Sequence, residues 1–119
     1  MTPQATVLIV EDDAGMRQFL EDVLRLRGYQ VLTATDVPEA EATGQRLGLE
    51  HLDLVILGLQ VHEGDTLGQR WGAQAPHLPF ILISDDRISG RLDPPMVWWL
   101  AKPLTPDTSL TAVRDSLGS

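Results

Sequence analysis

The chain has 119 residues, of which 43% are hydrophobic and 22% charged, as expected for one globular domain with its own core. It has no cysteine, which excludes disulfides, thiol catalysis and cysteine-ligated metal centres. A net charge of −8 makes it a poor ligand for phosphate backbones, so we expect no direct nucleic-acid binding. No apolar stretch is long enough to cross a bilayer and none is typical of a signal peptide, so we expect a cytoplasmic protein without membrane contact.

Five short apolar runs alternate with segments of helical periodicity along the chain. The runs cover residues 7–10, 31–32, 54–57, 80–83 and 97–100. Most are continuously apolar, which is the pattern of strands buried on both faces of a parallel sheet. Strands that alternate with helices predict right-handed crossovers and helices on both faces. We therefore expect a doubly wound α/β fold with a five-stranded parallel sheet, in which residues 1–119 form a single domain.

The helices are marked by their apolar stripes and by the residues at their ends. Apolar side chains spaced by three and four residues between positions 16 and 24 predict a first helix, which stops at Gly28. Asp36 is the expected N-cap of a second helix. A third helical segment, over residues 66–75, is weakened by its glycines. Thr105 is the expected N-cap of the last helix.

The stretch between the fourth and fifth apolar runs is poor in helix-forming residues. Residues 85–95 contain Gly90, Pro94 and Pro95, which leave room for a turn or two at most. We therefore expect the fourth helix to be shortened or missing.

Polar side chains stand where several of the predicted strands end. Glu11 and Asp12 follow the first strand, Ser84 ends the fourth, and Lys102 follows the fifth. Because ligands bind beyond the carboxyl ends of strands in such a sheet, these side chains are expected on one rim. Together they could hold a divalent cation and a phosphoryl group. Taken singly, each has a simpler role as a solvated turn or helix cap, a local backbone hydrogen bond, or a surface lysine.

With the strands before them, these residues resemble the receiver domain of bacterial two-component response regulators over essentially the whole chain. The resemblance is carried by residues 7–13 with Arg17, 53–57, 79–84 and 99–103. It implies a flavodoxin-like sheet of strand order 2-1-3-4-5. In that family an acidic pair binds Mg²⁺, and an aspartate ending the third strand accepts a phosphoryl group from a histidine kinase. A Ser/Thr and a lysine hold the phosphate oxygens, and an aromatic residue on the fifth strand reports the change.

The resemblance assigns these roles by position in the sequence. Glu11 and Asp12 match the acidic pair, Ser84 the hydroxyl and Lys102 the lysine, while Trp99 matches the switch aromatic. On this interpretation the first four are the remnants of a phosphoryl-binding site.

The departure from the family lies at the acceptor, where Gly58 stands in place of the aspartate. Glu63 and Asp65 are expected in the following loop, too far along to replace it. Glycine offers no carboxylate, so the family's phosphorylation chemistry is expected to be absent. Without the central carboxylate, Glu11 and Asp12 are expected to bind Mg²⁺ weakly or not at all, and no other cofactor is expected.

The favoured hypothesis is a degenerate receiver domain without enzymatic activity, acting as a phosphorylation-independent protein–protein interaction module. Its partner would be a histidine kinase, an output domain, or a second copy docking at the edge of the fifth strand. Two alternatives stay open: a conventional phosphorylation-dependent response regulator with a different acceptor, and a flavodoxin-like protein that binds a small ligand. Against the second, no glycine-rich phosphate loop follows the first strand.

Overall fold

The computed structural model describes residues 5–58, 61–84, 96–101 and 104–117. Their elements, in chain order, are β1 (Thr6–Val10), α1 (Ala14–Leu26), β2 (Gln30–Ala34), α2 (Val37–Leu47), the short 3-10 helix η1 (Leu49–His51), β3 (Leu54–Leu57), α3 (Val61–Gln74), β4 (Phe80–Ser84), β5 (Met96–Ala101) and α4 (Pro106–Ser116). Each of the five apolar runs lies within a strand. The predicted α/β architecture is confirmed.

The strands form one parallel sheet in the order β2-β1-β3-β4-β5. The inner strand β1 places Leu8 opposite Leu32 of β2 and Val55 of β3. The parallel pairing and the order of the first four strands are those predicted, and β5 pairs in parallel with β4. Because all strands run in the same direction, the residues that follow β1 and β3 emerge side by side at the carboxyl edge.

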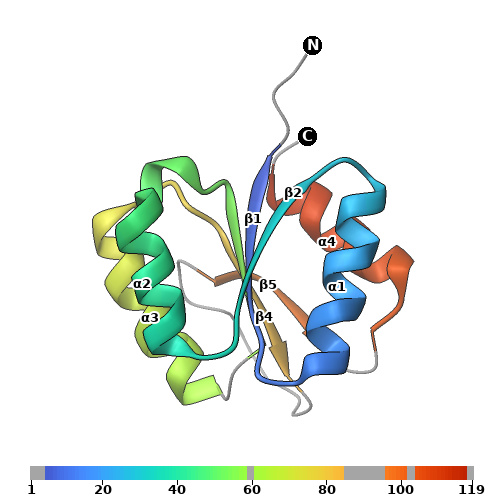
Figure 1. Ribbon diagram of the computed structural model, residues 1–119, viewed down its shortest axis with the longest axis horizontal. Coiled ribbons are helices and arrows are strands. Elements are labelled where there is room, and N and C mark those ends of the chain that lie inside the picture. The colour runs from blue at the N-terminus through green and yellow to red at the C-terminus, as the bar shows by residue number, and fades with distance from the viewer. Residues whose placement is uncertain (1–4, 59–60, 85–95, 102–103, 118–119) are drawn as a thin grey trace.

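Helices cover both faces of the sheet, α2 and α3 on one and α1 and α4 on the other (Figure 1). Successive side chains of β1 point to opposite faces of the sheet. Leu8 and Val10 pack in one core, and Val7 and Ile9 pack in the other. Side chains on a strand alternate between its faces, so a strand covered on both sides must be apolar at every position. This explains the continuous apolar runs of the sequence.

Side-chain caps begin three of the helices. The Oδ1 of Asp13 accepts hydrogen bonds from the backbone N–H groups of Gly15 and Met16 at 2.8 and 3.2 Å, which starts α1. Asp36 caps α2 through the N–H of Glu39, as predicted. Thr105 caps α4 in a reciprocal capping box, also as predicted. These bonds satisfy N–H groups that have no partner inside the helix.

Removal of the cap on α1 gives a direct test of its contribution. We expect Asp13→Ala to lower the free energy of unfolding by about 1 kcal/mol, because two N–H groups lose their acceptor. Urea denaturation followed by circular dichroism measures the change. The matched control is Asp12→Ala, which removes the same charge from an exposed neighbour and should change stability by less than about 0.5 kcal/mol. Equal effects of the two substitutions would contradict the capping role.

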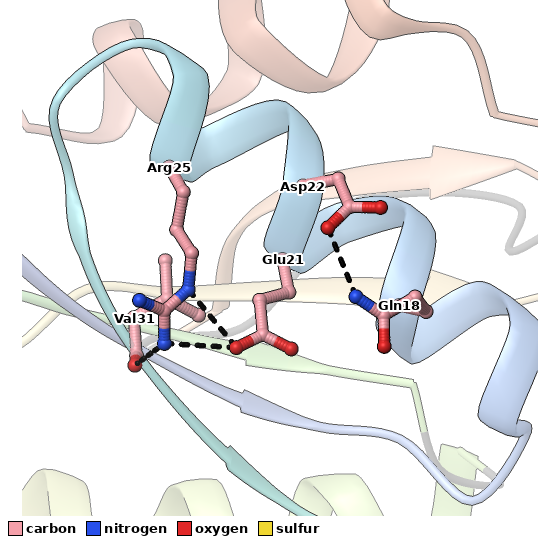
Figure 2. Close-up of polar contacts among 5 residues, drawn as sticks. All are labelled: Gln18, Glu21, Asp22, Arg25 and Val31. Atoms are coloured by element: carbon pink, nitrogen blue, oxygen red, sulfur yellow. Dashed lines mark hydrogen bonds and ion pairs between the residues drawn. The ribbon is translucent and has the colours of Figure 1, made fainter.

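Helix α1 is tied to the edge strand β2 through Arg25 (Figure 2). Its Nε donates to Glu21 one turn earlier at 3.0 Å, and its Nη2 donates to the backbone carbonyl of Val31 at 3.2 Å. Gln18 and Asp22 form a second pair along the same helix at 2.9 Å. Of these three bonds, the one to Val31 joins two elements, α1 and β2.

Two expectations from the sequence concern the segments after β3 and β4. The helix predicted at residues 66–75 begins earlier, at Val61, so Glu63 and Asp65 belong to a helix and the prediction of a loop there was wrong. Packing of Leu67 and Trp71 in the core outweighs the poor helix propensity of the glycines. The shortened or missing fourth helix falls in residues 85–95, outside the described residues.

Candidate functional site

The carboxyl edge of the sheet brings Glu11 and Gly58 together. Val10 pairs with Leu57 in the register of β1 and β3, and the next residue of each strand is Glu11 or Gly58. The N–H of Gly58 donates to the carbonyl of Val10 at 2.7 Å, and the N–H of Glu11 donates to the carbonyl of Ala34 at 3.0 Å. The sheet hydrogen bonds therefore continue one residue beyond the strands and fix the backbones of both residues.

Glu11 is completely buried, with none of its surface exposed. Its Oε1 accepts a hydrogen bond from the backbone N–H of Asp13 at 3.1 Å. Its backbone carbonyl accepts one from Nη1 of Arg17 at 2.8 Å. The side chain thus points into the protein, and the backbone on either side of it is tied to the first turn of α1.

Gly58 has no side chain, and the space beside it is filled by Glu11. A Cβ atom at position 58 would lie 2.6 Å from Cδ of Glu11 and closer still to Oε2, inside the 3.0 Å below which a neighbour must shift. The third atom it would approach is Cβ of Glu11, at 3.4 Å. The carboxylate of Glu11 therefore occupies the volume into which a side chain at position 58 would project.

The three acidic residues after β1 have three different environments. Glu11 is buried, Asp12 is exposed, and Oδ1 of Asp13 accepts the hydrogen bonds that cap α1. A magnesium ion needs several oxygen ligands at near-octahedral positions around one point. Among the residues that the structure describes, no group of three or more acidic or histidine side chains is placed to hold a metal ion. These side chains do not fit a magnesium site.

Of the other predicted site residues, Ser84 and Trp99 lie on the strands that follow β3 in the sheet, and Lys102 lies outside the described part. Ser84 ends β4 and is paired with Ala101 of β5, so its backbone stands at the same carboxyl edge as Gly58. Trp99 lies on β5, opposite Leu82. Lys102 lies outside the described residues. The sheet thus places Glu11, Gly58 and Ser84 along one edge.

Asp53 lies at the opposite edge of the sheet, where β3 begins. Its Oδ2 accepts a hydrogen bond from the N–H of Thr6 at 2.8 Å, so its carboxylate joins the start of β1 to β3. This position rules it out as a replacement acceptor at the carboxyl edge.

The sequence interpretation missed the contact between Glu11 and Gly58. The signal available in the sequence was a glutamate, one methylene longer than aspartate, on the strand beside a glycine. The two residues can be recognised as neighbours only once the register of β1 and β3 is known.

Solved structures of receiver domains have the same architecture. The response regulator receiver domain of Methanospirillum hungatei aligns with 98% of this chain and 95% of its own, with a TM-score of 0.85 and 20% identity. The chemotaxis response regulator CheY4 of Vibrio cholerae aligns over 97% of this chain and 100% of its own, with a TM-score of 0.79 and 26% identity. With the fold described above, these matches define the chain as a response-regulator receiver domain of two-component signalling.

The family follows from the sequence itself. Residues 6–115 match the model of the family described as flagellar regulatory protein FleQ, and the chain belongs to that family. A probable transcriptional regulator, ycf27 of Porphyridium aerugineum, is 32% identical over 93% of this chain and 47% of its own length. The alginate biosynthesis transcriptional regulatory protein AlgB of Pseudomonas aeruginosa is 31% identical over 96% of this chain and 26% of its own. The chain therefore spans less than half of the length of these two relatives.

In the part of the chain that the structure describes, no helix is both long and apolar enough to cross a bilayer.

Proposed function

We propose that this receiver domain is a phosphorylation-independent protein–protein interaction module and has no enzymatic activity. The observation that carries the proposal is the pairing of Glu11 with Gly58 at the carboxyl edge of β1 and β3. The position of the family's acceptor has no side chain, and the volume beside it is already occupied by a carboxylate from the neighbouring strand.

The chemistry of phosphoryl acceptance supports the proposal. A carboxylate oxygen must attack phosphorus, forming the new oxygen–phosphorus bond as the bond to the donor's leaving group breaks. Gly58 supplies no such oxygen, and the oxygens of Glu11 are buried, one of them held by the N–H of Asp13. Asp53 lies at the other edge, and Asp12 faces solvent.

The proposed partner is the output part of a longer transcriptional regulator. The relatives named above are transcriptional regulators, and this chain spans half or less of their length. The net charge of −8 makes DNA an unfavourable direct ligand for this domain, which favours a protein surface as its target. A histidine kinase and a second copy of the chain are further candidates. A second copy would pair at β5, because an edge strand offers unpaired backbone groups.

Intact mass spectrometry tests the proposal directly. We expect the protein to gain no phosphoryl group when it is incubated with Mg²⁺ and acetyl phosphate, because position 58 has no nucleophile. In parallel, a Mg²⁺ titration should produce no saturable change in tryptophan fluorescence. A conventional receiver domain treated in the same way serves as the positive control. A gain of one phosphoryl group would support the alternative of a conventional regulator with a different acceptor.

The flavodoxin-like alternative requires a ligand site at the carboxyl edge of the sheet. Among the described residues, a cavity of about 520 Å³ lies near the amino ends of β3 and β4, lined by residues of α2, η1 and α3 together with His77. An ion pair between Arg70 and Glu41 and the ring of Trp71 form part of its wall. Because no glycine-rich phosphate loop follows β1, we rank this alternative lower, and flavin absorbance in the purified protein would support it instead.

A further inference from the structure

We infer that Glu11 is an internal replacement for the acceptor side chain, so that its carboxylate, reaching across from β1, holds the rim in one arrangement that needs neither phosphate nor metal. This inference deepens the proposed function and rests on it, because it concerns the same carboxyl edge of β1 and β3. It goes further in stating that the volume beside position 58 is filled, and that Glu11 and Gly58 depend on each other.

Glycine is favoured at position 58 by the space available there and not by its backbone conformation. Among the described residues, the glycines with positive φ are Gly28 and Gly48, so the backbone at position 58 is one that any residue adopts. The three nearest atoms that a Cβ would meet there all belong to Glu11. A side chain at position 58 would therefore have to displace the end of one side chain, that of Glu11.

The backbone of Glu11 is fixed by hydrogen bonds, and its side chain is held by the start of α1. Its N–H donates to the carbonyl of Ala34 at the end of β2, and its carbonyl accepts from Nη1 of Arg17 in α1, so the backbone from which the side chain extends is fixed. Its Oε1 holds the N–H of Asp13, the residue whose own side chain caps α1. A displacement of the carboxylate would release that N–H and loosen the first turn of the helix.

Together these contacts make the end of β3, the end of β1 and the start of α1 one packed unit. A receiver that is switched by phosphorylation needs a rim whose arrangement changes with the ligand. Here the group that fills the centre of the rim is part of the chain and is always present. Regulation through this domain must therefore come from what binds its surface, which is the behaviour expected of an interaction module.

A double-mutant cycle tests the dependence of the two residues on each other. Gly58→Ala should raise the unfolding equilibrium constant about 30-fold, because the added methyl group overlaps the carboxylate of Glu11. Combining it with Glu11→Ala should remove that penalty, leaving the double variant within about threefold of Glu11→Ala alone. The control is Glu11→Gln combined with Gly58→Ala. Glutamine keeps the size of glutamate, so this pair should remain as impaired as Gly58→Ala. Urea denaturation of each variant, without Mg²⁺ or a phosphodonor, supplies the constants.

Two results would overturn the inference. One is a Gly58→Ala variant as stable as the unmodified protein, and the other is a cycle in which the two effects simply add. If Gly58→Ala does not fold, the comparison of Glu11→Ala with the double variant still decides, because only a folded and equally stable double variant agrees with the inference. The mass measurement with acetyl phosphate is independent of this cycle. If the two effects add and the protein is not phosphorylated, the inference about Glu11 and Gly58 is wrong and the proposed function stands. If the effects are coupled and the protein is phosphorylated, the inference stands and the proposed function is wrong.

Discussion

Restoring an aspartate at position 58 is expected to destabilise the domain by about 4 kcal/mol, or to prevent folding, instead of restoring a phosphorylation site. The Cβ of Gly58→Asp would overlap the Glu11 carboxylate, and overpacking of this kind costs about 1–3 kcal/mol. The new carboxylate would also be buried against a second carboxyl group, which adds a desolvation and repulsion penalty of several kcal/mol unless one of them takes up a proton. Urea denaturation at neutral pH measures the loss.

The companion variant for this experiment combines Gly58→Asp with Glu11→Ala, which vacates the overlapping volume. We expect it to recover about 2 kcal/mol relative to Gly58→Asp alone, because the steric part of the penalty disappears. Intact mass after treatment with acetyl phosphate and Mg²⁺ should show no phosphoryl group on the single variant. A Gly58→Asp protein that is as stable as the unmodified chain and becomes phosphorylated would show that Glu11 yields its place easily, contrary to the packing described here.

Truncation of Leu24 is expected to cost about 3 kcal/mol, because this side chain is completely buried in the core between the sheet and helices α1 and α4. Leucine-to-alanine changes in a core lose the transfer free energy of the side chain and leave a cavity that relaxes only in part. Chemical denaturation with an unchanged dependence on denaturant concentration would show that stability alone has changed.

The same helix provides a matched control. Leu26 is two residues further on and 84% exposed, so Leu26→Ala removes the same atoms from solvent and should change stability by less than about 0.5 kcal/mol. A comparable loss in the two variants would mean that the last turn of α1 packs differently from the arrangement described here.

The strands were predictable from the sequence because the physics of a sheet covered on both faces leaves a strong pattern. Residues 54–57 are apolar at every position and form β3 with the same limits. Helix ends with a side-chain cap were equally readable, as Asp36 and Thr105 show. The start of α3 was not, because the local propensity of a glycine-containing segment is weak and the helix depends on Leu67 and Trp71 packing against the sheet.

The sequence was enough to predict which residues stand at the carboxyl edge of the sheet. It was not enough to predict how their side chains pack against one another. The sequence alone shows that Gly58 has no carboxylate and that Glu11 and Ser84 belong to the same edge. A missing side chain is naturally interpreted as a gap. The direction of the Glu11 side chain depends on the register of β1 against β3 and on the N–H of Asp13, which are tertiary features.

The overlap at position 58 also bears on how such a domain can evolve. A mutation that restored aspartate at position 58 would have to displace the Glu11 carboxylate, at a cost in stability that natural proteins hold only in small excess. Shortening Glu11 first would remove a buried group that holds the N–H of Asp13, without yet supplying an acceptor. Each of these changes alone is therefore expected to lower stability. A change at either position is expected to be tolerated best when the other position changes with it.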